Sequence, residues 1–365
     1  MAIIPSTQKF HTVAENIPTK NRGSELANSR REAFTMQDII DTVPVPPSSP
    51  SLFEEGTGGA ASTQRVGSGT ASGDTSTISG GNANSASGVQ STIGGGRSNI
   101  ASSGYSTVGG GYDNTASDVY STVSGGKDNT ASASSSTVGG GTYNTASGFF
   151  SVVSGGNTNT ASGGRSFIGS GYANQSIGEY TVISGGSYNT ASGDYTTISG
   201  GRDNNANKQS ATVGGGIGCT ASGYFSTVGG GRFNTASGGE NSTVAGGNSN
   251  SASSASSTVG GGYGNIASGN RSTVGGGAYN TVSGYKSFIG GGAYNIASSE
   301  NSVIVGGSYN NTSTFASTII AGSGITADQG GCTFVSKLSI KSIPTSAAGL
   351  PSGSVWSNGG VLNIV

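Results

Sequence analysis

The architecture of this chain follows from the stretch Ser257-Thr258-Val259-Gly260-Gly261-Gly262 and from Asn265-Ile266-Ala267-Ser268-Gly269, which comes two residues later. Variants of this stretch recur almost without a break from Thr77 to Ser317, and the step from Val259 to Val274 gives a period of 15 residues. We number the repeat positions 1 to 15, with Thr258 at position 1. A fixed period of this kind indicates a protein built from stacked structural repeats.

Two positions of the repeat carry its regular apolar side chains. Position 2 is Ile or Val in every copy, and position 10 is Ala in most copies, with Ser176, Val282 and Thr312 as exceptions. β-Branched residues favour strands, whereas each of the many glycines would cost about 1 kcal/mol in a helix. The alternation of a strand places Val108 inside and Thr107 outside. We therefore predict an all-β fold, a parallel β-solenoid or β-roll whose coils each contain two short strands and two turns.

Two further positions are nearly invariant within the repeat. Position 5 is Gly in every complete copy, as at Gly111, which predicts a corner with positive φ or a close approach of backbones. Position 8 is Asn in every complete copy except one, where Cys219 replaces it. Because Asn tolerates the left-handed conformation and hydrogen-bonds to nearby backbone, we expect a structural Asn ladder along the stack. One copy carries an extra residue between Gly238 and Ser242, at a turn where a solenoid tolerates it.

Composition divides the chain into four segments. An N-terminal module covers residues 1–43, a Pro-, Ser- and Gly-rich linker covers 44–69, the repeat shaft covers 70–328, and a C-terminal β cap covers 329–365. About 17 coils of 15 residues, stacked at about 4.8 Å, predict a shaft of roughly 80 Å.

The two end segments each contain a local structural signal. In the N-terminal module, Phe34, Thr35, Asp38 and Ile39 predict the start of a short helix, with Thr35 as N-cap and Phe34 packed against Ile39. In the cap, two apolar runs flank Asn358-Gly359-Gly360, which predicts a β-hairpin. A hairpin at this end would cover the last coil and block growth of the sheet edge.

The composition argues against several classes of protein. Only 9% of residues are charged and the formal net charge is -1, so we expect no nucleic-acid partner. No apolar run approaches the length of a membrane span, and the N-terminus does not resemble a signal peptide. The two cysteines, Cys219 and Cys332, and the single histidine, His11, give neither a disulfide framework nor a metal site. We expect no cofactor and no enzymatic activity.

The coil interior is small, so a second buried surface is expected. A Val or Ile and an Ala bury about 3–5 kcal/mol of apolar surface, less than the ordering of about 15 residues costs. Position 1 points outward and is usually Thr, but some coils carry a larger apolar side chain there. These residues are Val152, Phe167, Val182, Phe288 and Val303. We predict that they form the contact face of a homo-oligomer, a trimer. Ile100, Ile266 and Ile296 at position 9 make the opposite strand a competing face.

The repeats quoted above resemble the head repeats of trimeric autotransporter adhesins, over residues of roughly 70 to 327. Members of that family form left-handed parallel β-rolls packed as trimers, and the resemblance implies the same architecture here. Their repeats are usually shorter and differ in motif, and residues 325–365 lack the composition of the family's membrane anchor. The resemblance therefore supports the architecture rather than a role on a bacterial surface.

A second resemblance concerns the two ends of the chain. The opening Met1-Ala2-Ile3-Ile4-Pro5-Ser6-Thr7-Gln8-Lys9-Phe10-His11 and the segment from Phe34 to Val43 resemble the start of virion structural proteins of marine cyanophages. The run Ser346-Ala347-Ala348-Gly349-Leu350-Pro351 with the hairpin resembles the ends of phage and large-virus fibre proteins. These likenesses imply a fibre or adhesin on the virion surface, docked on other virion proteins through residues 1–43.

All 14 tyrosines fall at turn positions of the repeat. Four of them are the candidate surface for stacking on sugars of a host glycan: Tyr263, Tyr279, Tyr285 and Tyr294. The alternative is that these rings pack over neighbouring turns or across a subunit boundary, in which case the chain is a passive spacer or a capsid-decorating fibre.

Two further alternatives are disfavoured by the sequence. An ice-binding solenoid would use the Thr column at position 1, which Phe167 and Phe288 interrupt. A tailspike glycan hydrolase would need paired carboxylates, whereas Glu179, Asp194 and Asp203 lie in turns without a repeated partner.

Overall fold

The computed structural model describes residues 53–55, 63–65, 69–312, 318–336, 343–352, 354–358 and 361–364. Strands, turns and bends make up these ranges, and no helix occurs in them. The predicted helix start at Phe34, Thr35, Asp38 and Ile39 lies outside the described residues, as does the rest of residues 1–43.

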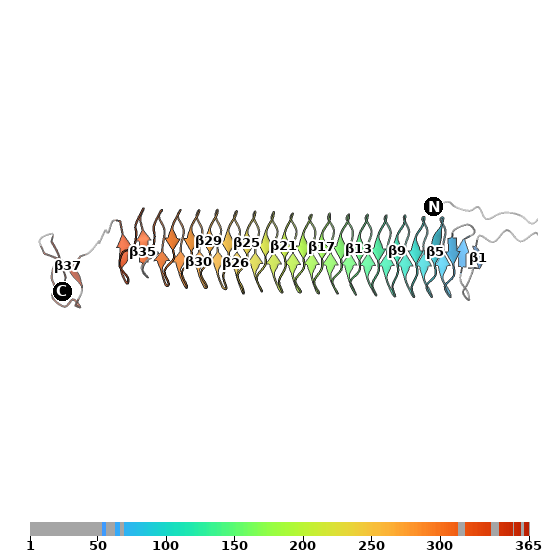
Figure 1. Ribbon diagram of the computed structural model, residues 1–365, viewed down its shortest axis with the longest axis horizontal. Helices are drawn as coiled ribbons and strands as arrows, with labels where there is room; N and C mark the ends of the chain where they lie inside the picture. Colours follow the sequence, from blue (N-terminus) through green and yellow to red (C-terminus); the bar gives the residue numbers. More distant parts are fainter. Residues whose placement is uncertain are drawn as a thin grey trace, which may run out of the picture. The chain divides into compact units, whose positions relative to one another are not determined.

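The described strands form a parallel β-solenoid, as predicted, and one separate hairpin (Figure 1). Two long sheets run along the solenoid, and we call them sheet A, of 20 strands, and sheet B, of 16 strands. The strands of sheet A are β1 Phe53–Glu55, β2 Thr63–Arg65, β4 Thr77–Ile78, β6 Thr92–Ile93, β8 Thr107–Val108, β10 Thr122–Val123, β12 Thr137–Val138, β14 Val152–Val153, β16 Phe167–Ile168, β18 Val182–Ile183, β20 Thr197–Ile198, β22 Thr212–Val213, β24 Thr227–Val228, β26 Thr243–Val244, β28 Thr258–Val259, β30 Thr273–Val274, β32 Phe288–Ile289, β34 Val303–Ile304, β35 Thr318–Ala321 and β36 Thr333–Val335. The strands of sheet B are β3 Gly69–Ala71, β5 Asn84–Ala86, β7 Ile100–Ala101, β9 Thr115–Ala116, β11 Thr130–Ala131, β13 Thr145–Ala146, β15 Thr160–Ala161, β17 Gln175–Ser176, β19 Thr190–Ala191, β21 Asn205–Ala206, β23 Thr220–Ala221, β25 Thr235–Ala236, β27 Ser251–Ala252, β29 Ile266–Ala267, β31 Thr281–Val282 and β33 Ile296–Ala297.

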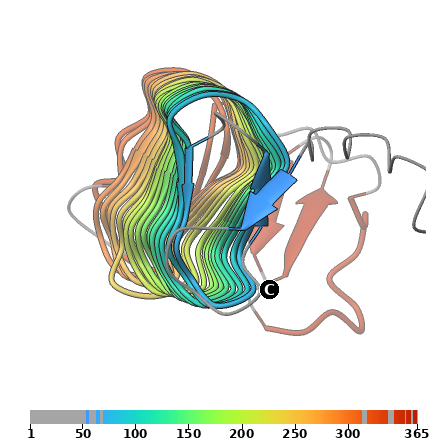
Figure 2. The same ribbon diagram turned by 90° about the vertical axis from the view of Figure 1, so that its right-hand side faces the viewer.

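Within the repeats, each strand pairs in parallel with the equivalent strand of the next coil, as Val123 does with Val138. A third column of parallel bridges runs along position 6, for example between Arg97 and Tyr112. The coils therefore stack in register, and the view along the solenoid shows their outlines turning gradually from the blue end to the orange end (Figure 2). The sequence pattern predicted the two sheets but not the third column.

The inside of the solenoid repeats from coil to coil. The Ile or Val of position 2 and the Ala of position 10 are fully buried, as at Val108 and Ala116. The Ser of position 15 and the Asn of position 8 are buried with them, as at Ser106 and Asn114. Thr107, between two buried neighbours, points outward and is half-buried, as the alternation of a strand predicts.

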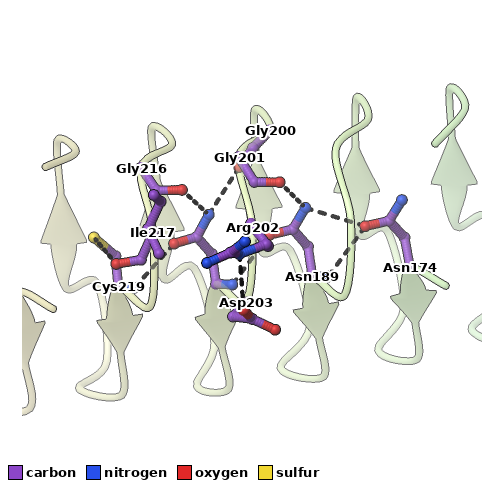
Figure 3. Close-up of polar contacts among 10 residues, drawn as sticks. Asn174, Asn189, Gly200, Gly201, Arg202, Asp203, Gly216, Ile217 and Cys219 are labelled. Atoms are coloured by element: carbon purple, nitrogen blue, oxygen red, sulfur yellow. Dashed lines mark hydrogen bonds and ion pairs between the residues drawn. The ribbon is translucent and has the colours of Figure 1, made fainter. Parts of the chain in front are cut away.

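The asparagines of position 8 form the predicted ladder (Figure 3). The backbone N–H of Asn189 donates to Oδ1 of Asn174 at 3.1 Å. The Nδ2 group of Asn189 donates to the carbonyl of Gly185 at 3.0 Å in its own coil and to that of Gly201 at 3.0 Å in the next coil. Each Asn thus closes one turn and joins two coils, and it satisfies backbone groups that the coil buries.

The sharp corners lie at other positions than the asparagines. Gly111 at position 5 has φ +96, and a Cβ there would lie 2.1 Å from the carbonyl oxygen of Gly126, so the predicted need for Gly is confirmed. The left-handed residues are those of positions 7 and 14, such as Asp113 with φ 54 and Tyr120 with φ 59. The asparagines of position 8 do not use the left-handed conformation that Asn tolerates, because the residue before each of them makes the turn and the Asn itself is buried.

Sheet A extends beyond both predicted limits of the shaft. Strands β1 and β2 pair antiparallel with each other, and β2 pairs with β4, although residues 44–69 were predicted as linker. Strand β36 pairs in parallel with β35, so a segment expected in the cap continues the sheet. The predicted hairpin is confirmed as β37 Val355–Asn358 and β38 Val361–Ile364, which pair antiparallel.

The insertion between Gly238 and Ser242 lies at a turn, as predicted. Tyr224 in the preceding coil donates its N–H to the carbonyl of Gly239 at 3.1 Å, and its own carbonyl accepts the N–H of Asn241 at 2.9 Å. Sheet A keeps its register across this coil, since Thr227 still pairs with Thr243.

Candidate binding surface

The large exposed side chains gather along the two lines of turns that run down the solenoid. We call the turns of positions 6 and 7 edge 1 and those of positions 13 and 14 edge 2. A left-handed residue in each turn places its N–H on the carbonyl of the preceding coil, as Tyr279 does on Tyr263 at 2.9 Å and Tyr105 on Val89 at 2.8 Å. Successive side chains are therefore held one coil apart and facing the same way.

Edge 1 carries a continuous column of four tyrosines near its C-terminal end. The ring centroids of Tyr263 and Tyr279 are 5.1 Å apart at an interplanar angle of 82°. Tyr279 stacks on Tyr294 at 5.1 Å and 14°, and Tyr294 on Tyr309 at 5.0 Å and 6°. A hydrogen bond with Tyr263 raises the pKa of Tyr279, with a smaller contribution from burial. The tyrosine column joins three of the four predicted residues and adds Tyr309.

Tyr285, the fourth predicted residue, lies on edge 2 and is separate from the tyrosine column. Its hydroxyl accepts a hydrogen bond from Nη1 of Arg271 at 3.2 Å. The ammonium of Lys286 lies 4.8 Å from the centroid of its ring. Its surroundings are thus cationic, whereas the tyrosine column is neutral.

Edge 2 carries a second column, which the sequence reasoning missed. The guanidinium of Arg165 lies 5.8 Å from the ring centroid of Phe149, 5.9 Å from that of Phe150 and 5.1 Å from that of Tyr180. Tyr195 stacks on Tyr180 at 5.0 Å and 4°. The signal was available, because Phe150, Arg165, Tyr180 and Tyr195 all occupy position 14.

Stacking limits how these columns can contact a ligand. A ring between two parallel neighbours has its faces covered, so it offers only its edge and, for Tyr, its hydroxyl group. Tyr294, between Tyr279 and Tyr309, is in this situation. Contact through a ring face is therefore possible only at the ends of a column, which excludes Tyr294 from the tyrosines predicted to stack on a sugar.

The predicted oligomer face lies on the outer side of sheet A. Val152, Phe167 and Val182 are adjacent in register, and so are Phe288 and Val303. Phe167 is 37% exposed and Phe288 is 39% exposed. The competing residues of sheet B, Ile100, Ile266 and Ile296, are exposed to a similar degree.

Two of the three carboxylates weighed for catalysis are neighbours, and the third lies on the other edge. The N–H of Glu179 donates to Oδ1 of Asp194 at 2.9 Å on edge 2, whereas Asp203 lies on edge 1 and pairs with Arg202 at 3.2 Å. Within the described ranges, no group of three or more His, Cys, Asp or Glu side chains is placed to hold a metal ion. None of the described segments is a helix long and apolar enough to cross a membrane.

Comparison with protein-family models gives no match, and a search of curated proteins gives no relative. The functional argument therefore depends on the surfaces described above.

Proposed function

We propose that this chain is a structural fibre or adhesin of a phage virion, which projects from the particle surface and contacts the host through its turn edges. One observation carries the proposal: the inside of every coil is nearly the same, while the exposed edges vary and concentrate aromatic side chains in columns. In a solenoid, side chains at the turns can change without disturbing the stacked core, so binding surfaces develop there.

We propose a homotrimer as the assembled form, with sheet A at the subunit contact. The two apolar groups on this sheet, around Phe167 and Phe288, are about eight coils apart, which is roughly 38 Å at the strand spacing. Copies aligned in parallel and in register bring each group against its own kind. Antiparallel copies would place the group of three apolar residues on one copy against the group of two on the other. The unequal sizes of the groups therefore favour parallel copies, the arrangement that a fibre with one base and one tip requires.

The docking role of residues 1–43 is part of the same proposal and depends on their likeness to virion proteins. Particles assembled with a chain that lacks residues 1–43 should contain no fibre, while the truncated chain should still fold and trimerise when purified. Normal incorporation of the truncated chain would overturn this assignment.

Attachment tests the adhesin against the passive spacer. Replacing the tyrosine column, Tyr263, Tyr279, Tyr294 and Tyr309, with Ser should reduce binding of purified fibre to host cells while the shaft stays folded. A matched control replaces Tyr112, Tyr143, Tyr172 and Tyr188 with Ser, which lie on the same edge outside the column. A further variant replaces the aromatic residues of the edge 2 column with Ser. If all three variants attach to host cells as the parent chain does, the passive spacer is favoured.

A further inference from the structure

We propose that Arg271, Tyr285 and Lys286, which we call the cationic cluster, bind the carboxylate of an acidic sugar on edge 2. The inference deepens the proposed adhesin function, on which its biological role rests, by naming the chemical class of the ligand and the residues that hold it. The cluster is separate from the tyrosine column, which lies on edge 1 and is neutral.

The cluster places two cations at one repeat position in adjacent coils. Arg271 and Lys286 both occupy position 14, and no other two adjacent coils of the described shaft carry Lys or Arg at the same position. Both residues are left-handed, with φ of 57 and 54, so their side chains leave the turn in the same direction. The N–H of Lys286 donates to the carbonyl of Asn270 at 3.0 Å, which holds the two turns one coil apart.

Both cations gather around the ring of Tyr285. Nη1 of Arg271 donates to the Tyr285 hydroxyl oxygen at 3.2 Å, and the ammonium of Lys286 lies 4.8 Å from the ring centroid. Because the hydroxyl oxygen accepts from Arg271, its own proton is left to donate to a ligand. The guanidinium, the ammonium and the phenol proton are all donors, and such a set suits an oxyanion.

No carboxylate within the described ranges pairs with these cations. In the part of the chain that the structure describes, ion pairs occur only on edge 1. Glu300 is the one carboxylate at positions 13 and 14 of the two flanking coils, and its Oε1 atom accepts a hydrogen bond from Nδ2 of Asn301 at 3.4 Å. Like charges at facing positions of neighbouring strands repel, so an anion held between Arg271 and Lys286 would relieve this repulsion.

The turns of these coils favour a sugar over a peptide. An extended peptide adds to a sheet through backbone hydrogen bonds at an open edge. Here the N–H groups of Arg271, Lys286 and Asn301 already donate to carbonyls of the preceding coil, at 3.0, 3.0 and 2.9 Å. The remaining donors belong to exposed side chains, which can contact the carboxylate and hydroxyl groups of a sugar ring without any backbone contact.

Titrations of the full chain followed by saturation-transfer NMR test the cluster, with methyl galacturonide and methyl galactoside as probes that differ in the carboxylate. We expect the galacturonide to bind at least about tenfold more tightly, because its carboxylate accepts charge-assisted hydrogen bonds. Arg271→Gln and Lys286→Gln should each weaken its binding about tenfold, whereas Lys286→Arg, which keeps the charge, should retain most of the affinity.

Lys208→Gln is the matched control. It removes one exposed cation from the same edge, outside the cluster, and should bind the galacturonide as the parent chain does. All the substituted residues are exposed, so thermal unfolding of the variants should stay close to that of the parent chain.

Four outcomes would overturn the inference. Equal binding of the galacturonide and the galactoside would show that the carboxylate is not recognised, and an equal loss in Lys208→Gln would show attraction to net charge alone. Acetate that competes as well as the galacturonide would indicate an adventitious ion only. Tighter binding of N-acetylglutamate amide would assign the cluster to an acidic peptide instead.

Host attachment separates this inference from the proposed function. If a chain with both Gln substitutions attaches normally while the variant without the tyrosine column does not, the adhesin stands and the cationic cluster is not its ligand site. If the galacturonide binds as expected but no variant of either edge changes attachment, the cluster stands and the proposed adhesin falls.

Discussion

The backbone N–H of Cys219 donates a hydrogen bond to Oδ1 of Asn204 at 2.9 Å, and the asparagine ladder of the described coils is interrupted at this cysteine. Its Sγ atom lies 3.6 Å from the carbonyl of Gly231, at the place where an Asn would donate from Nδ2. Cys219 has no side-chain oxygen to receive the N–H of Asn234. The coil of Cys219 therefore joins the next coil through fewer hydrogen bonds than its neighbours do.

Restoring the ladder should stabilise the shaft. We expect Cys219→Asn to raise the free energy of unfolding by about 1–3 kcal/mol, the sum of two or three buried hydrogen bonds. Denaturant unfolding at fixed protein concentration measures the change. Cys219→Ser is the control, because its short side chain reaches fewer of these partners and should give no gain. An equal effect of the two substitutions would show that the ladder does not limit stability.

Adjacent glycines should respond differently to alanine. Gly111→Ala places a side chain at φ +96 and 2.1 Å from a backbone oxygen, so we expect a loss of at least about 2 kcal/mol. Gly110→Ala, one residue earlier, meets no atom closer than 4.0 Å and should change the stability by less than about 1 kcal/mol. Thermal unfolding of both variants checks the pair. A similar loss in both would mean that glycine entropy rather than corner geometry dominates.

A charged residue introduced on the outer side of sheet A should separate the subunits of the proposed trimer. We expect Phe288→Asp to convert the proposed trimer to monomer or to unfold the shaft, because it would bury an unpaired carboxylate at the proposed contact. Ile296→Asp makes the matched change on sheet B and should leave the trimer intact. Sedimentation velocity decides between the faces. The reverse pattern would assign the contact to sheet B, and a stable folded monomer of the parent chain would exclude both.

Tyr279 should titrate at a higher pH than an unperturbed tyrosine does. The hydrogen bond with Tyr263 raises the pKa of Tyr279 above 10.0, so it favours the protonated phenol in the folded chain. Its contribution to stability is therefore complete below pH 10 and is lost as the pH rises through the higher folded pKa. Tyr263→Phe should lower the pKa of Tyr279 in an ultraviolet titration. Tyr309→Phe, which does not contact Tyr279, should leave it unchanged.

The fold was largely predictable from the sequence because every repeat places the same residue types at the same buried and corner positions. The inward Ile or Val of position 2 and the corner Gly of position 5 determine the strand and the turn, and their period determines the stacking. The ends were less predictable. Strands β1, β2 and β36 lie where the repeat motif is lost, since backbone hydrogen bonds to a preformed edge can order a segment without the motif.

The candidate surface was predictable only in part. Turn positions identified the tyrosines as exposed, but membership of one column depends on which edge a residue occupies. Positions 7 and 13 lie on different edges, which separates Tyr285 from Tyr294.

The interchangeable coils give this shaft a means of changing length in evolution. Every coil presents nearly the same backbone donors and acceptors to the next, so recombination between misaligned repeats would add or delete whole coils without creating a mismatched junction. Each event would move the tip by about 4.8 Å and leave the rest of the rod untouched. The length of the shaft is thus a heritable quantity that changes in uniform steps, independently of the side chains exposed on its turns.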